Sequence, residues 1–194
     1  MTGEAEDWAA RDAAVVWHGF TQMAAFEDNA PIIVASAEGR ELIDVDGRRY
    51  LDAVSSWWVN LFGHANPRIN RAIAAQLGEL EHVILAGFTH RPVIELAERL
   101  DALAPGNLGH AFFGSDGASA TEIALKMAFH YWKNRDRPGK TAFLSVAGGY
   151  HGETLGALAV TDVPVFRDAY APLLHRNMTV PSPDARGAGP GETA

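Results

Sequence analysis

A turn made of glycine and small residues opens a helical pattern in the stretch FFGSDGASATEIALKMAFHYW, residues 112–132. Ser119 and Glu122 have the spacing of a capping box, in which serine binds a helix amide and glutamate reaches back. The free amides and the dipole at a helix start suit a phosphate equally well. The turn alone leaves both interpretations open. It lacks the G-x-x-x-x-G-K-[ST] and G-x-G-x-x-G patterns, so nucleoside triphosphates and dinucleotides are disfavoured.

Tyr150 and His151 stand between glycines in VAGGYHGET, directly after a predicted strand. Ligands of open α/β sheets gather where strands end, and an aromatic ring there stacks on a planar cofactor. A histidine at this point is able to donate a hydrogen bond or carry a proton, although a single histidine is more often structural. These two residues are therefore candidates for cofactor contact.

Trp57 and Trp58 are adjacent in the sequence SSWW. If this stretch is part of a strand, neighbouring side chains point to opposite faces of the sheet. We expect one tryptophan in the core and the other on the wall of a pocket, with packing of both as the alternative.

The chain has few lysines, no cysteine and no closely spaced histidines of the kind that bind metals. The lysines are Lys126, Lys133 and Lys140, and none follows a predicted strand. The eight histidines show no H-E-x-x-H spacing, and there is no cysteine, so we predict no metal site, no disulfide and no thiol nucleophile. The lack of cysteine fits the cytoplasm.

The composition excludes two classes of partner. A net charge of −8 argues against nucleic acid, because phosphate contacts need a basic surface. No apolar run approaches the length of a membrane span, and the acidic first residues are unlike a signal peptide.

The elements that position the candidate residues follow an α/β order. A hairpin is predicted around Asp46-Gly47, with both turn residues at positive φ. Asn66 caps a helix that Pro67 begins, and a second helix follows Pro92. Strand 110–113, helix 119–133 and strand 141–146 then give the β-α-β order of a parallel sheet. The helix face expected to pack on this sheet comprises Ala120, Ile123, Ala124, Met127 and Tyr131.

Six motifs in order resemble the N-terminal half of class III, pyridoxal-phosphate-dependent aminotransferases: WHGFTQM, SAEGRELIDVDGRRYLDAVSSWW, GHANPRI, FTHRPVIELAERL, the stretch 112–132 and GGYHGET. The resemblance implies the fold of type I pyridoxal-phosphate enzymes (aspartate aminotransferase-like), an α/β fold truncated within its large domain. It assigns residues 1–65 to the small domain, 66–181 to the first part of the large cofactor domain and 182–194 to a cut loop or flexible tail.

The resemblance also implies roles for individual residues. Gly117 and Ala118 match the turn that holds the cofactor phosphate, and many relatives carry serine in place of Ala118. Tyr150 matches the aromatic residue that lies against the pyridine ring and also borders the substrate, and His151 follows it. Trp57 and Phe20 match positions in the substrate pocket, and many relatives carry tyrosine in place of Phe20. Glu153 matches an acidic position near the site.

Within class III, the pairing of the WH-x-F-T start with SSWW is most similar to the branch that acts in biotin synthesis. That branch moves the amino group of S-adenosylmethionine to 8-amino-7-oxononanoate and gives 7,8-diaminononanoate. The resemblance implies a cytoplasmic homodimer.

The Schiff-base lysine of the family has no counterpart in this chain, so we expect an inactive fragment with no catalytic residue of its own. Three alternatives remain open: a fragment of an omega-amino-acid transaminase, a half-subunit that pairs with a full-length homologue, and a simple phosphate-binding module.

Overall fold

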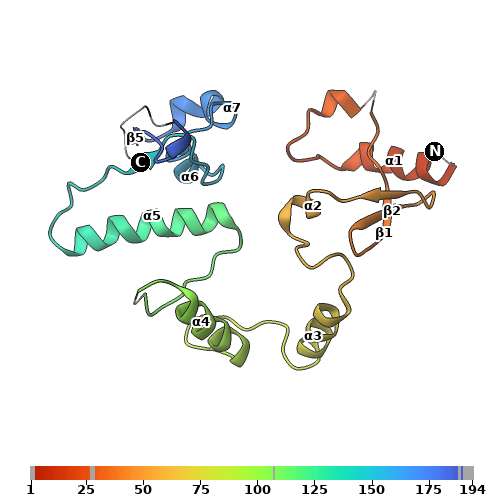
Figure 1. Ribbon diagram of the computed structural model, residues 1–194, viewed down its shortest axis with the longest axis horizontal. Helices are drawn as coiled ribbons and strands as arrows, with labels where there is room; N and C mark the ends of the chain where they lie inside the picture. Colours follow the sequence, from red (N-terminus) through yellow and green to blue (C-terminus); the bar gives the residue numbers. More distant parts are fainter. Residues whose placement is uncertain (1–2, 27–28, 107, 188, 190–194) are drawn as a thin grey trace. The chain divides into compact units, whose positions relative to one another are not determined.

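The computed structural model describes residues 3–26, 29–106, 108–187 and 189, and it divides into two compact units between His90 and Arg91 (Figure 1). Each unit is described by itself. The domain boundaries predicted at 65/66 and 181/182 stay predictions. Part of the predicted tail, residues 188 and 190–194, lies outside the described residues.

The first unit contains a small antiparallel sheet in the order β1-β2-β3, with a register shift in β1 between Val34 and Ser36. Its elements are α1 (Gly3–Val15), η1 (Met23–Phe26), β1 (Val34–Glu38), β2 (Glu41–Asp44), β3 (Arg49–Leu51), α2 (Ser55–Trp58) and α3 (Pro67–Leu77).

The predicted hairpin forms between β2 and β3, but its loop has three residues and not two. The Asp44 amide donates to the Arg48 carbonyl at 3.0 Å, and the Gly47 amide donates to the Asp44 carbonyl at 2.9 Å. Of the two predicted turn residues, only Gly47 has a positive φ, of 80°. A loop with glycine at this third position is the next most common solution after a two-residue turn.

The helix start predicted at Asn66 is confirmed. Its side-chain oxygen accepts from the amides of Arg68 and Ile69, and Pro67 occupies the first turn of α3. The cap satisfies two amides that have no partner inside the helix.

The strand interpretation of SSWW is wrong. Ser55, Ser56, Trp57 and Trp58 have φ values of 51°, 46°, 68° and 68°, so α2 is a single left-handed helical turn. For residues with a side chain this conformation costs roughly 1–2 kcal/mol each. The contacts that hold the turn therefore matter more than its local sequence.

The second unit has a two-stranded parallel sheet in which Leu144 pairs with Met178 and Val146 with Val180. A parallel sheet was predicted, but with strand 110–113 as the partner of 141–146 and not with residues 178–180. Its elements are α4 (Arg91–Leu103), α5 (Gly117–Asn134), β4 (Leu144–Val146), α6 (Leu155–Ala159), α7 (Pro164–Arg167), η2 (Asp168–Leu173), β5 (Met178–Val180) and η3 (Ala185–Gly187). The strand predicted at 110–113 is wrong, because no strand of the described chain pairs with this segment.

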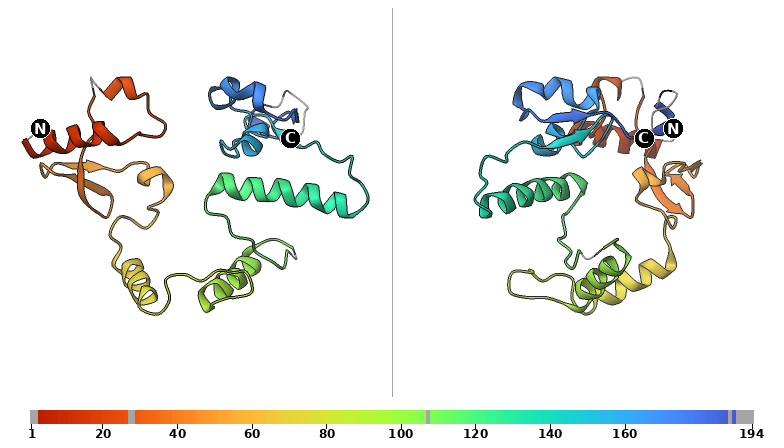
Figure 2. Two further views of the ribbon diagram at one scale, coloured as in Figure 1. Left: turned by 180° about the vertical axis from the view of Figure 1, so that it is seen from behind. Right: turned by 60° about the vertical axis from the view of Figure 1, so that its left-hand side comes forward.

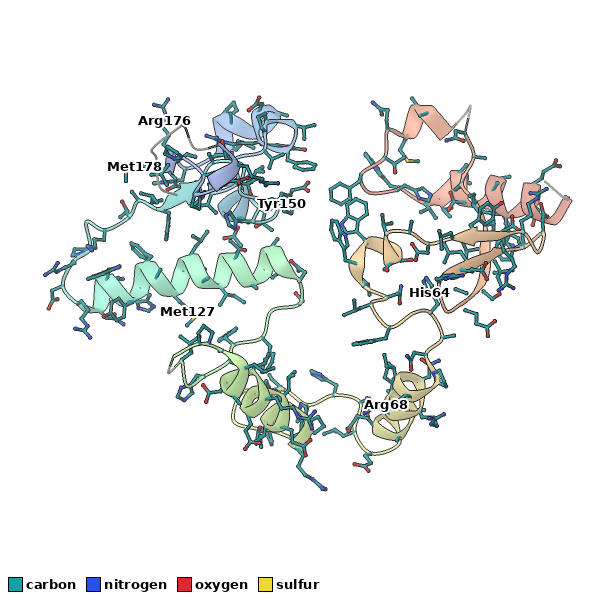
Figure 3. All side chains as sticks on the ribbon, in the orientation of Figure 1. His64, Arg68, Met127, Tyr150, Arg176 and Met178 are labelled. Carbon is teal, nitrogen blue, oxygen red and sulfur yellow. The ribbon has the colours of Figure 1, made fainter. Side chains whose placement is uncertain are left out.

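The buried centre of the second unit surrounds α6, which lies alongside α5 (Figure 2). Ala157, Leu158 and Thr161 are almost completely buried there. The face predicted for α5 is wrong: Met127 is 56% exposed and projects away from α6 and β5 (Figure 3). The other side of the helix, with Leu125 and Phe129, instead lines a cavity of about 230 Å³ next to Phe143.

Candidate functional site

The turn before α5 is capped by Asp116 and not by Ser119. Its carboxylate accepts from the Ser119 amide at 2.8 Å and from the Ser119 hydroxyl at 2.7 Å. These two bonds, the hydroxyl first, lower the pKa of Asp116. The predicted capping box is therefore wrong, since Ser119 is already inside the helix.

Glu122, the other member of that predicted box, reaches forward to a different segment. Its Oε1 accepts from the Thr154 hydroxyl at 2.7 Å, the Gly156 amide at 2.7 Å and the Ala157 amide at 3.2 Å. The Thr154 hydroxyl contributes most to a lowered pKa of Glu122. The carboxylate satisfies amides at the first turn of α6, which gains no bond from its own capping residue.

The start of α5 and the loop around His151 are tied together directly. The Thr121 hydroxyl donates to the His151 carbonyl at 2.9 Å, and the His151 amide donates to the Thr161 hydroxyl at 3.0 Å. Gly152 has a φ of 118°, and a Cβ there would lie 2.6 Å from the Cβ of Ala118. Only glycine allows this approach. The structure thus brings Gly117 and Ala118 next to the segment that carries Tyr150 and His151.

Tyr150 is 52% exposed, and its hydroxyl donates to the Glu153 carboxylate at 2.9 Å. This bond raises the pKa of Tyr150. The Phe166 ring lies 5.5 Å away between centroids, and Figure 3 shows Tyr150 beside α6. Tyr150 therefore presents a ring that is fixed at its hydroxyl end and accessible on its remaining surface.

The two other predicted site residues, Phe20 and Trp57, belong to the first unit. Their ring centroids are 5.4 Å apart, and the Trp57 and Trp58 rings are 5.7 Å apart and edge-on. Trp57 is 62% exposed. Phe20 thus contacts the left-handed turn that carries Trp57 and Trp58, and both ring–ring distances lie within the usual range.

The described residues contain no group of three or more histidine, aspartate or glutamate side chains that would hold a metal ion. None of the helices in that part of the chain combines the length and the apolar character needed to cross a membrane.

The family model for class III aminotransferases matches residues 22–190. The chain belongs to the class III aminotransferase family. Members of this family depend on pyridoxal phosphate. The expected type I fold is confirmed by solved transaminases that superimpose on this class III chain with TM-scores of 0.85 to 0.87.

Similar proteins carry one name repeatedly. The adenosylmethionine-8-amino-7-oxononanoate aminotransferase of Helicobacter pylori is 46% identical over 92% of the chain and 41% of its own length. The solved enzyme of that name from Methanocaldococcus jannaschii has a TM-score of 0.87 and 40% identity over 92% of the chain and 41% of its length. The omega transaminase of Pseudomonas jessenii, solved with PMP, has a TM-score of 0.85 and 27% identity over 94% of the chain and 41% of its length. The chain spans about two fifths of these relatives.

The start of α5 fits the phosphate of the family cofactor. A Cβ at Gly117 would meet nothing within 4 Å, and the Gly117 amide has no hydrogen bond within the described part of the chain. Both features leave room for an anion at the first turn of an 18-residue helix. The Asp116 carboxylate is the opposing feature, because it carries negative charge to the same amides.

Sequence reasoning missed several residues of this site. Asp116 had a usable signal, an aspartate immediately before the helical pattern. Glu122 and Thr121 had none, since their partners lie about thirty residues further along the chain.

Replacing Glu122 is expected to loosen α6. In Glu122→Gln one oxygen still accepts, but the charge is lost, so the Leu158 amide should exchange with solvent about tenfold faster, equivalent to roughly 1.4 kcal/mol. Because the pKa of Glu122 is lowered, the native protein should lose the same protection as the pH falls below 4.5, whereas the variant should not. Hydrogen exchange followed by NMR measures both, with the exposed Glu153→Gln as control. Unchanged protection in Glu122→Gln would contradict the assigned role.

Removing the charge of Asp116 is expected to strengthen phosphate binding. Asparagine caps helices as well as aspartate, so Asp116→Asn keeps the helix start and removes a like charge close to the phosphate. We expect pyridoxal phosphate to bind roughly fivefold more tightly, measured from the shift of the Gly117 amide signal on titration. Asp101→Asn removes the same charge elsewhere in the unit, where Asp101 accepts from the Gly109 amide. Equal gains in both variants would argue against a local effect.

Proposed function

We propose that the chain provides the N-terminal part of an aminotransferase that moves the amino group of S-adenosylmethionine to 8-amino-7-oxononanoate, giving 7,8-diaminononanoate. The observation that carries this proposal is sequence identity within one fold. The solved enzyme of that name and the omega transaminase superimpose almost equally well, but their identities to the chain are 40% and 27%. The fold supports transamination, and the identity favours the biotin branch.

The residues of the second unit have defined tasks in this proposal. The amides of Gly117 and Ala118 hold the phosphate, the Tyr150 ring lies against the pyridine ring, and His151 keeps its backbone bonds to Thr121 and Thr161. When bound, the cofactor supplies the electron sink that amino transfer requires. Glu153 keeps the Tyr150 hydroxyl engaged, so the ring holds one orientation.

The first unit supplies the substrate side. Trp57 and Phe20 border the substrate as an apolar, aromatic surface, and Phe20 offers no hydroxyl to it. We further propose that the complete enzyme works as a homodimer in the cytoplasm. The absence of cysteine supports a compartment where disulfides do not form.

A chimera tests the reaction. We expect residues 1–194 joined to the remaining part of the Helicobacter pylori relative to transfer the amino group from S-adenosylmethionine and not from an omega-amino acid such as 4-aminobutyrate. The reason is that the substrate-side aromatic residues come from this chain. Product is measured by mass spectrometry, and the unaltered Helicobacter pylori enzyme is the control. Preference for the omega-amino acid would favour the rival transaminase.

The chain alone should not bond the cofactor covalently. Lys126 and Lys133 lie roughly 14 and 24 Å along the α5 axis from Gly117, and the Lys140 ammonium sits 3.6 Å from the centre of the Trp132 ring. After addition of pyridoxal phosphate and borohydride, intact mass should therefore show no stoichiometric adduct. The Helicobacter pylori enzyme is the positive control. A full adduct at one of the three lysines would refute the expectation.

A further inference from the structure

The left-handed turn of Ser55 to Trp58 is an exposed feature that its own sequence does not favour. None of its residues is glycine, and all have φ values between 46° and 68°. Such a conformation persists only where surrounding contacts determine it, and these outliers concentrate at functional sites. The question is which contacts hold this turn.

The Asp52 carboxylate makes the side-chain contacts that fix the start of the turn. Its Oδ1 accepts from the Ser56 amide at 2.9 Å, and its Oδ2 accepts from the Ser56 hydroxyl at 2.7 Å. Oδ2 also lies 2.7 Å from the Nε2 of His64. The Asp52 side chain is only 5% exposed. The Ser56 amide is the first cause of a pKa of about 2 for Asp52, so the carboxylate is ionised at neutral pH.

His64 connects this carboxylate to the sheet. The His64 amide donates to the Gly39 carbonyl at 2.7 Å, and the Gly39 amide donates back to the His64 carbonyl at 3.1 Å. The Asp52 amide donates to the Arg40 carbonyl at 2.9 Å. Residues 39 and 40 form the connection between β1 and β2. Asp52 and His64 are therefore anchored to the same point of the hairpin, and Figure 3 shows His64 in the segment that follows α2.

The consequence of this arrangement is the direction of two indole rings. Trp57 and Trp58 follow Ser56 directly, so a turn of the opposite hand would point both rings elsewhere. In the structure, Trp57 contacts the Phe20 ring, which comes from a distant loop of the same unit. The contact depends on the hand of the turn.

We propose that Asp52, braced by His64, is the positioning residue that sets the left-handed turn and with it the aromatic wall formed by Trp57 and Phe20. That this wall contacts substrate rests on the proposed function, whereas the hold of Asp52 on the turn does not. Asp52 acts on the two rings through Ser56.

The test uses the whole chain, labelled with ¹⁵N, and reads the indole N–H signals of its five tryptophans. Trp57→Phe and Trp58→Phe assign the two signals of the turn. In Asp52→Asn we expect both signals to shift most of the way to their unfolded positions, while the amide signals of β2 and β3 persist. In Asp52→Glu, which keeps the carboxylate, both signals should lie closer to their native positions than in Asp52→Asn.

Asp44→Asn is the matched control. Asp44 is equally buried in the same unit and accepts from two backbone amides and a hydroxyl, those of Asp46, Arg48 and Tyr50. It should leave the Trp57 and Trp58 signals in place. Unchanged indole signals in Asp52→Asn, or equal shifts in both variants, would overturn the proposal.

If Asp52→Asn also removes the sheet signals, Ser56→Ala decides. It deletes one donor to the carboxylate, so we expect smaller shifts confined to the two indoles, and no shift would overturn the proposal. None of these readouts uses the cofactor or a substrate. A failed amino-transfer assay would therefore reject the proposed function and leave the role of Asp52 standing.

Discussion

The Glu122 carboxylate joins two segments of the second unit that are far apart in the sequence. From inside α5 it accepts the Thr154 hydroxyl and two amides at the start of α6. Because α6 is only five residues long, its free amides are a large share of its hydrogen-bonding groups. Together with the bond from the Thr121 hydroxyl to the His151 carbonyl, this contact holds the turn at Gly117 and the loop that carries Tyr150 next to each other.

The first unit uses the same physical device for a different end. Asp52, like Glu122, is an ionised carboxylate that accepts from a backbone amide and a hydroxyl at once. Hydrogen bonds to a charged acceptor are roughly twice as strong as neutral ones. In the first unit they offset the cost of left-handed backbone, and in the second they cap a short helix. In both cases the carboxylate orders backbone next to an aromatic residue, Tyr150 in the second unit and Trp57 in the first.

Local signals in the sequence predicted local structure well. The Asn66 cap and the hairpin that turns at Gly47 follow from rules that act over a few residues. Several of the failures depend on distant partners. Glu122 was assigned to its own helix end because the sequence does not reveal Thr154 as its partner. SSWW was assigned to a strand because its own residues do not reveal the contacts of Asp52 and His64 at this turn. The segment 110–113 was assigned to a strand because its residues are strand-like, but it has no neighbouring strand in the described chain.

The family resemblance implies the site residues, and the structure explains how two groups of them are held. The network around Glu122 and the network around Asp52 share no residue among those described. Substitutions in contacts that have no common partner usually have additive effects. We therefore expect a change on the turn of Ser55 to Trp58 to leave the contacts of Glu122 unaltered.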